Sequence, residues 1–355
     1  MRKTPQRASL CRAWLGAGLA ALLVTSFAGS CHGRERLAGD VERIMMIGFT
    51  VGDMEREVEF FSKVLRFEKV SDFRVVGSEY DKLQGVFNAN MRIVHLQLGE
   101  QTIELTQYIS PPTGRPVPIS SYSIDEWFEH MAIVVTDMDA AYSILQEHNV
   151  RQISAQPITI PQSNAGAAGI KAIKFHDPER HDLELIYFPR GKGNAAWQMA
   201  SNRLFLGIDH TAMTVGSTEK GATFYRELMG FEIGGTTLNT GPTQAVLDGL
   251  FNVTCLVTAM LPARVPAHVE FLDYKTPAGG RPMPADTSAS DLWHWQTSLV
   301  TRDIGALADQ LRKAGAQFIS PEVIVIPQDA QAKLGFRKAL MVRDPNGHAL
   351  RLIEE

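Results

Sequence analysis

The amino-acid sequence predicts an α+β protein in which four similar units form two halves, preceded by an N-terminal export segment. Three observations predict this organisation: a repeat that relates the two halves, a strand–turn–helix pattern that occurs twice in each half, and a basic segment followed by an apolar run at the start of the chain. The 355 residues are 45% hydrophobic and 21% charged, which is long enough for two domains and apolar enough for packed cores. A disordered or collagen-like chain is therefore excluded.

The first 31 residues have the three-part pattern of a secretory signal peptide. Basic residues between Arg2 and Arg12 are followed by an apolar run over residues 13–24 and then by small residues that end at Cys31. The run is shorter than the about 20 residues that a membrane span needs, and an uncut anchor helix is the alternative. Small residues before a cysteine also resemble a bacterial lipoprotein signal, with Ala28 departing from the leucine that this motif prefers. We expect an exported protein of the cell envelope or periplasm, either lipid-anchored at Cys31 or secreted.

The charge balance gives no indication of a nucleic-acid partner. The whole chain has a formal net charge of −4, and the signal segment contributes four basic residues and no acid, so the remainder carries −8. An acidic body is atypical of proteins that bind nucleic acid or anionic membranes through electrostatics. We expect a small-molecule partner, no nucleic acid, and membrane contact only through a lipid at Cys31.

An internal repeat divides the body of the chain into two halves. The segment 108–118 (YISPPTGRPVP) recurs as 274–284 (YKTPAGGRPMP), 166 positions later. A repeat of this length indicates a duplicated structural block. We therefore expect a first domain over residues 40–190, a turn-rich linker over 189–204 and a second domain over 205–355.

Each half divides again into two units. Every unit begins with a short alternating strand, continues with an amphipathic helix and closes on another alternating strand. The expected units cover residues 43–108, 127–188, 206–274 and 293–355. Their helices are expected at residues 54–65, 138–148, 218–228 and 304–314. Their closing strands are expected at residues 102–106, 182–186, 268–272 and 349–353.

Four short motifs give the units a specific resemblance. Two are first strands that begin with histidine, at His130 and His210, and two are closing turns, DPERHDLE over 177–184 and DPNGHALR over 344–351. Together they resemble the vicinal oxygen chelate superfamily, the fold of glyoxalase I, bleomycin-resistance proteins and extradiol dioxygenases. The resemblance covers nearly all of 43–355. It implies βαβββ units, paired into two glyoxalase-like domains, with each pair forming a curved sheet around a site.

The resemblance also implies metal ligands on the first and last strands of the units. Glyoxalase I-like enzymes have His or Gln, then Glu, His and Glu at these positions. The first half offers Met46, Glu104, His130 and Glu184, so that only the thioether of Met46 departs. We expect Glu104, His130 and Glu184 to converge on one divalent ion (Fe, Mn, Zn or Ni), with Glu104 or Glu184 as the catalytic base.

The second half offers His210, Glu270, Gln296 and Arg351 at the same positions. The first three are further candidate metal ligands. Arg351 has no lone pair to donate, and we expect it to bind a carboxylate or phosphate of the substrate instead. His294 lies on the same strand face as Gln296, and it is a second expected substrate-binding residue or a replacement ligand. The alternative is that these are polar strand residues, or that one site has become structural.

Three functions follow from these residues. The first is a metal-dependent lyase or isomerase of the glyoxalase kind, acting on a small molecule that chelates the ion through two adjacent oxygens. The second is an extradiol dioxygenase, which is disfavoured because neither half supplies both histidines of that family's ligand set. The third is a non-catalytic protein that sequesters a small molecule. Because the glutathione adduct used by glyoxalase I is scarce outside the cytoplasm, we expect another substrate. The sequence is also compatible with a homodimer.

Overall fold

The computed structural model describes residues 37–112 and 114–355, so the predicted signal segment lies outside the described residues. The described chain is α+β, as predicted. The first unit consists of β1 (Val41–Thr50), α1 (Met54–Lys63), β2 (Glu68–Val76), α2 (Ser78–Gln84), β3 (Asn90–Leu98) and β4 (Gln101–Ser110). The second unit consists of β5 (Glu129–Val135), α3 (Met138–Glu147), β6 (Ile158–Thr159), β7 (Lys171–His176) and β8 (Asp182–Tyr187).

A short 3-10 turn, η1 (Ala195–Gln198), lies in the linker between the halves. The third unit consists of β9 (Phe205–Thr214), α4 (Thr218–Thr223), its continuation η2 (Phe224–Leu228), β10 (Glu232–Thr240), α5 (Gly241–Asp248), β11 (Thr254–Leu261) and β12 (His268–Thr276). The fourth unit consists of β13 (Trp295–Thr301), α6 (Ile304–Lys313), β14 (Gln317–Phe318), β15 (Ile324–Val325), α7 (Gln328–Leu334), β16 (Lys338–Arg343) and β17 (Ala349–Glu354). Within the described residues, no helix is long and apolar enough to cross a lipid bilayer.

The main helix of each unit begins at a side-chain cap. The caps are Asp53, Asp137, Ser217 and Asp303, and each accepts a hydrogen bond from a backbone N–H of the first helical turn. Such caps satisfy donors that have no partner within the helix. The four predicted helices and the four predicted closing strands are confirmed.

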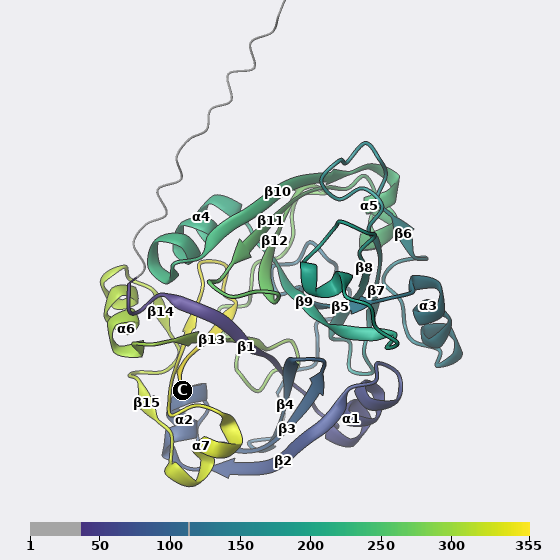
Figure 1. The fold of residues 1–355 in the computed structure, drawn as a ribbon. Helices are drawn as coiled ribbons and strands as arrows, with labels where there is room; N and C mark the ends of the chain where they lie inside the picture. Colours follow the sequence, from purple (N-terminus) through teal and green to yellow (C-terminus); the bar gives the residue numbers. More distant parts are fainter. Residues whose placement is uncertain (1–36, 113) are drawn as a thin grey trace, which may run out of the picture. The chain divides into compact units, whose positions relative to one another are not determined.

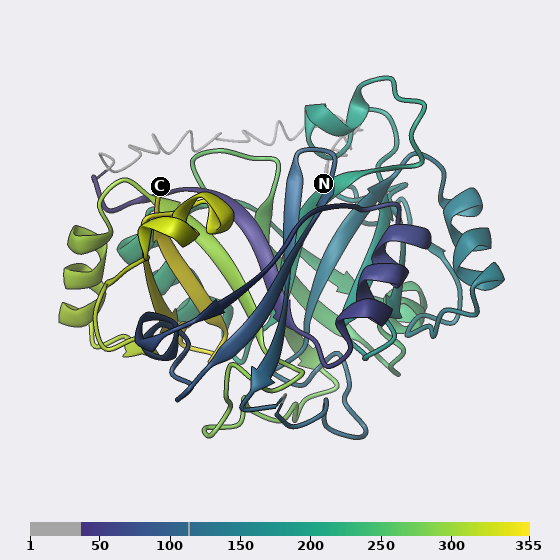
Figure 2. The same ribbon diagram turned by 90° about the horizontal axis from the view of Figure 1, so that it is seen from below.

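The strands form two sheets, and each sheet combines one unit from each half of the chain. Sheet A has the order β14-β16-β17-β13-β1-β4-β3-β2, with β15 beside β16, and sheet B has the order β10-β11-β12-β9-β5-β8-β7-β6. In Figures 1 and 2, the purple and blue strands of the first unit share a sheet with the green and yellow strands of the fourth. The expectation that the two units of one half form one curved sheet is therefore wrong.

The join in each sheet is an antiparallel pair of first strands. β1 pairs with β13, and β5 pairs with β9. Alternating patterns specify which face of a strand is buried, but they do not specify which other strand lies at its free edge. The sequence therefore predicts the strands and leaves the pairing of the units undetermined.

The two hydrophobic cores on the outer faces of the sheets, in contrast, follow the halves of the chain. One cluster, almost entirely from the first half, packs α1 and α3 with the outer faces of β1, β5 and β8. A second cluster, almost entirely from the second half, packs α4, η2 and α6 with β12, β16 and β17. Each half thus has its own core and contributes to both sheets.

The inner faces of the two sheets differ in how they are covered. The inner face of sheet A carries one large apolar cluster, which includes residues from α2 and α7. The inner face of sheet B carries three small clusters and is covered by only one such helix, α5. At the position where the other three units have a short helix, the second unit has a loop over residues 160–170. The missing helix leaves space over sheet B.

The two repeated GRP loops hold the halves together by reciprocal ion pairs. Arg115 donates to Asp291 at 2.7 Å, and Arg281 donates to Asp125 at 2.7 Å, so that each loop binds an aspartate of the other half. The guanidinium groups also lie over Trp293 and Trp127, with distances of 4.7 and 4.4 Å to the ring centroids. These contacts give the loops a structural role.

We expect Arg281→Met to destabilise the fold by about 1–3 kcal/mol, because it leaves the buried carboxylate of Asp125 without its side-chain donor. The measurement is the free energy of unfolding from urea titration. Arg264→Met is the matched control, since this exposed arginine makes only a 3.7 Å ion pair with Glu42 and should cost at most about 1 kcal/mol. Equal costs for the two variants would contradict the structural role of the loop.

Candidate metal centre

Four ionisable side chains meet on the inner face of sheet B. They are His130 on β5, Glu184 on β8, His210 on β9 and Glu270 on β12. The strand register explains why they meet. Ala132 lies opposite both Glu184 and His210. Likewise, Ala212 lies opposite both His130 and Glu270. Two small residues in the centre therefore let four larger ones converge from four neighbouring strands.

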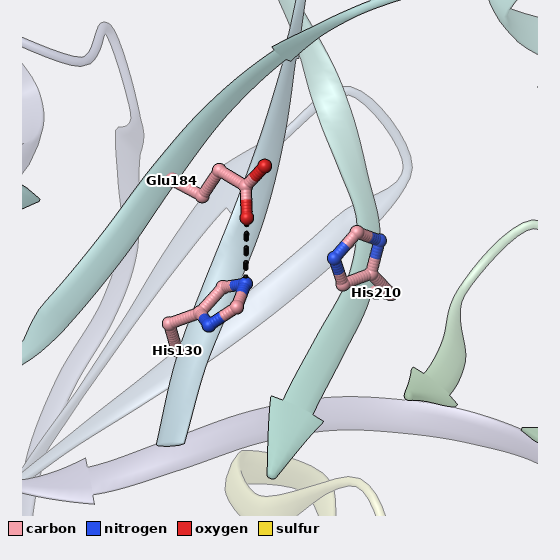
Figure 3. Close-up of side chains that lie close together, drawn as sticks. All are labelled: His130, Glu184 and His210. Carbon is pink, nitrogen blue, oxygen red and sulfur yellow. Dashed lines mark ion pairs between the residues drawn. The ribbon is translucent and has the colours of Figure 1, made fainter. Parts of the chain in front are cut away.

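The distances place three of the groups around a common point, with Glu270 beside His210. Nε2 of His130 is 2.7 Å from Oε2 of Glu184, and Nε2 of His210 is 3.6 Å from Oε2 of Glu270. The rings of His130 and His210 have centroids 5.8 Å apart. Figure 3 shows Glu184 and the two imidazoles directed toward one another, and one ligand atom from each of the three lies within 4.8 Å of the others.

Burial and neighbouring charges shift the pKa values of three of these groups. Burial, together with the nearby ammonium of Lys174, lowers the pKa of His130 and favours the neutral imidazole, the form that ligates metals. Although burial opposes it, the imidazoles of His210 and His268 lower the pKa of Glu270 to about 2. The charges of Glu270 and Asp209 likewise outweigh burial and raise the pKa of His210 to about 9. A bound cation would displace that proton.

The residues present fit a divalent ion. Both ring nitrogens of His130 are buried and have no hydrogen-bond partner, since the short approach to Glu184 lacks hydrogen-bond geometry. A buried polar atom without a partner is rare unless a ligand occupies its free direction. His210 donates from Nδ1 to Asp209 at 3.0 Å, which leaves Nε2 available and orients the ring, as carboxylates do for metal-binding histidines. Two imidazoles and two carboxylates suit Fe, Mn, Zn or Ni.

A cavity of about 510 Å³ opens beside the four residues. It is lined by all four, by aliphatic residues of both units and by Lys174 of β7. The Nζ of Lys174 donates to Asp248 at 2.7 Å, and both side chains are buried. Gln244 donates to the other oxygen of Asp248 at 2.8 Å. The cavity has the size of a small-molecule site.

The inner face of sheet A repeats the same register with different residues. Gly48 lies opposite both Glu104 and Gln296, as Ala132 lies opposite Glu184 and His210. Met46 and Arg351 both lie opposite Ser298. The four equivalent positions in sheet A are therefore Met46, Glu104, Gln296 and Arg351.

In sheet A the guanidinium of Arg351 takes the place of an added cation. It donates to Oε1 of Glu104 at 2.7 Å, and Gln296 donates to the same oxygen at 3.0 Å. His95 lies 3.0 Å from Oε2. Burial alone would raise the pKa of Glu104, but Arg351 and His95 lower it to about 2. The carboxylate is thus ionised, fully buried and already neutralised within the protein.

These positions correct the predicted grouping of the site. Glu104 does not join His130 and Glu184 around one ion, because it lies in the other sheet and is bonded to Arg351. Arg351, predicted to bind a substrate anion, has its guanidinium buried against Glu104 and Ser298, outside the cavity beside sheet B. Both departures from the family pattern, Met46 and Arg351, fall in sheet A, and all four donors fall in sheet B.

Two further predicted residues lie in sheet A, outside the cavity. Gln296 is bonded to Glu104. His294 lies just before β13, where burial and the charge of Arg343 lower its pKa to about 3. Neither lines the cavity beside sheet B. The expectation that His294 binds the substrate of that site is not met.

Sequence reasoning missed Asp209, His268, Lys174 and His95. Two of them had a signal in the sequence: Asp209 directly precedes the predicted ligand His210, and His268 lies on the same face of β12 as Glu270, two residues before it. His95 and Lys174 lie in the middle of strands whose pairing partners the sequence does not specify. Their place in the two sites becomes clear only from the strand pairing, in which His95 lies opposite Glu104 and Lys174 lies opposite Glu184.

Comparison with known proteins agrees with this architecture. Residues 43–185 and 207–352 match the Glyoxalase/Bleomycin resistance protein/Dioxygenase superfamily. A 2-epi-5-epi-valiolone epimerase from Actinomyces sp is 33% identical over 150 residues, which are 41% of this chain and 79% of that protein.

Two solved structures show the same fold. Glyoxalase I from Zea mays superposes with a TM-score of 0.56 at 14% identity, covering 88% of this chain and 92% of that chain. A putative dioxygenase from Bacillus subtilis subsp. subtilis str. 168 superposes with a TM-score of 0.53 at 16% identity, covering 89% of this chain and 86% of that chain.

We expect Arg351→Met to lower the free energy of unfolding at pH 7 by about 3–5 kcal/mol, because it leaves the buried carboxylate of Glu104 uncompensated. Urea titration measures the effect. The double variant Arg351→Met, Glu104→Gln should recover part of the loss, since no buried charge remains. A double variant no more stable than the single one would contradict the ion-pair explanation.

The same pair predicts a dependence on pH. The pKa of Glu104 in the folded protein, about 2, is below its ordinary value of 4.5, so its stabilising contribution is present above pH 4.5 and is lost as the pH falls toward 2. The stability difference between wild type and Arg351→Met should therefore shrink on acidification over this range. A constant difference would indicate that Arg351 acts through packing alone.

Proposed function

The chain belongs to the Glyoxalase/Bleomycin resistance protein/Dioxygenase superfamily, and we propose that it is a divalent-metal-dependent isomerase or lyase of that family. Its substrate would be a small molecule that chelates the ion through two adjacent oxygens. The observation that carries this proposal is the convergence of His130, Glu184, His210 and Glu270 beside a cavity of about 510 Å³.

The ion, when bound, would act as a Lewis acid on the two substrate oxygens. The chain itself supplies the proton transfer. Glu184 and Glu270 are the two carboxylates of the set, and they lie on strands β8 and β12, on opposite sides of the central pair β5 and β9. Glu270 has the more accessible side chain, 22% exposed against 8% for Glu184, so it is the better placed to exchange a proton with a substrate in the cavity. Glu104, predicted as a base, is buried in the other sheet.

The related epimerase supports the isomerase branch of this proposal. Epimerisation at a carbon beside a carbonyl removes a proton and returns it to the other face. That reaction requires groups that can hold a proton near the substrate, and two carboxylates on opposite sides of the site meet this requirement.

A ring-cleaving dioxygenase is the second candidate function. One observation favours it: two histidines and a carboxylate lie together in sheet B. Neither half supplies two histidines, but sheet B brings His130 and His210 together with Glu184. Two histidines and one carboxylate are the ligand set of non-haem iron oxygenases. Glu270, whose carboxylate lies 3.6 Å from Nε2 of His210, favours the isomerase or lyase. If it joined the other three residues as a ligand, fewer positions on the ion would be left for dioxygen beside the substrate oxygens.

Metal analysis tests the proposal. We expect the purified protein, reconstituted separately with Fe, Mn, Zn and Ni, to retain about one ion per chain with at least one of these metals. The variants His130→Ala, Glu184→Ala and His210→Ala should lose most of it, because each removes one of the four donors. Elemental analysis by mass spectrometry provides the measurement.

The variant His95→Ala is the matched control, since it removes a buried histidine from the equivalent site of sheet A. It should retain the metal. Loss of metal in His95→Ala alone would place the site in sheet A and contradict the proposal. A wild-type protein that takes up none of the metals would favour the third function, sequestration without chemistry.

We also propose that the protein is exported and that Cys31 carries a lipid, on the sequence pattern alone. Mass spectrometry of the native N-terminus should show an acylated Cys31. An unmodified chain that begins near Gly29 would indicate a secreted form, and an intact Met1 would contradict cleavage.

A further inference from the structure

We infer that the substrate of the sheet B site is uncharged and has an apolar body, with no phosphate, carboxylate or sulfonate outside its metal-binding oxygens. This inference rests on the proposed function, because it concerns the same cavity. The evidence for it is the small number of unpaired charged side chains among the residues that line the cavity.

The wall of the cavity is largely apolar. Among its uncharged side chains, aliphatic and aromatic residues outnumber polar ones, and they come from every side: Ile170 and Ile186 from the second unit, Leu247 from α5, and Val257 and Leu261 from β11. Such a surface binds hydrocarbon and excludes groups that need hydration.

Two of the polar neutral groups of the wall have partners within the protein. Asn239 accepts a hydrogen bond from Asn164 at 2.8 Å, and Gln244 donates to Asp248 at 2.8 Å. None of the polar neutral groups carries a charge that could pair with an anion. An anionic group would have to bring its own hydration into the cavity.

Lys174 is the one lysine or arginine among the described residues that line the cavity. Its ammonium is 2.7 Å from Asp248, with side chains 3% and 0% exposed. A buried ion pair of this kind is neutral as a unit, and separating it to bind another anion would leave Asp248 uncompensated. Lys174 is therefore not a free receptor for a substrate anion.

The metal-binding residues leave no positive charge in excess. Glu184 and Glu270 together balance one divalent ion. Asp209 adds a further negative charge and lies against the imidazoles of His210 and His268, at 3.0 and 4.0 Å. The site as a whole therefore has no excess positive charge to attract an anion that does not itself bind the ion.

Basic residues that neighbour the wall in the sequence also have partners. Arg264 lies 3.7 Å from Glu42, and Lys171 lies 3.7 Å from Asp139. Lys192 precedes Gly193 of the wall, and its Nζ donates to the carbonyl oxygens of Ala165 and Gly166 at 2.8 and 3.0 Å. It ties the linker to the loop over residues 160–170. Glutathione adducts, which carry two carboxylates, therefore fall outside the substrate class that this wall accepts, as do phosphate esters.

A matched pair of chelating probes tests the inference. Benzohydroxamic acid and 4-carboxybenzohydroxamic acid have the same two-oxygen metal-binding group and differ in the charge of the ring substituent. Binding to the cobalt(II)-loaded full chain is measured by the change in the visible spectrum of cobalt. We expect the carboxylated probe to bind at least about tenfold more weakly, since its charge loses hydration without gaining a partner.

A variant of the wall makes the test specific. Val257 is half-buried and lines the cavity from β11. Val257→Lys adds a free cation there and should strengthen binding of the carboxylated probe, whereas the control Val257→Gln, similar in length but neutral, should not. Equal affinity of the wild type for both probes would overturn the inference and leave the proposed function intact. Failure of the chain to take up cobalt, or of both probes to change its spectrum, would overturn the proposed function and this inference with it.

Discussion

The antiparallel pairing of first strands, β5 with β9 and β1 with β13, is the constraint on which the rest of the structure depends. It joins units from different halves of the chain into one sheet, and it decides which ionisable residues become neighbours. His130 and His210 meet only because β5 and β9 are adjacent. The candidate metal centre thus depends on the pairing of the two halves, and neither half contains it alone.

The two inner faces show two ways of compensating a buried carboxylate at the same register position. In sheet B, Glu184 lies 2.7 Å from Nε2 of His130, whose Nδ1 has no hydrogen-bond partner, an arrangement that a metal ion would complete. In sheet A, the guanidinium of Arg351 neutralises the charge of Glu104. An apolar cluster that includes residues of α2 and α7 fills the inner face of this sheet. A permanent guanidinium takes the position that a divalent cation would need, so the candidate metal site lies in sheet B and its counterpart in sheet A is an internal ion pair.

Packing and function are distributed differently along the chain. Each of the two hydrophobic cores on the outer faces belongs almost entirely to one half, while each sheet, the apolar cluster inside sheet A and each crossed arginine–aspartate pair span both halves. Separation of the halves would therefore disrupt the candidate site before it disrupted either core. The loop over residues 160–170, which takes the place of a covering helix, is what keeps the sheet B face open to a small molecule. A hydrogen bond from the side chain of Asn164 to that of Asn239 holds this loop against β10.

The sequence by itself determined the α+β class, the four main helices, the closing strands and the identity of the candidate ligands, because capping residues and periods of 3.6 and 2 are local signals. It also located both departures, Met46 and Arg351. Only the tertiary structure decided that His130, Glu184, His210 and Glu270 form one set and that Glu104 belongs to another. The physical reason is that a strand presents the same backbone hydrogen-bonding groups to any partner, so the choice of neighbour depends on how the helices, loops and cores of the whole chain pack.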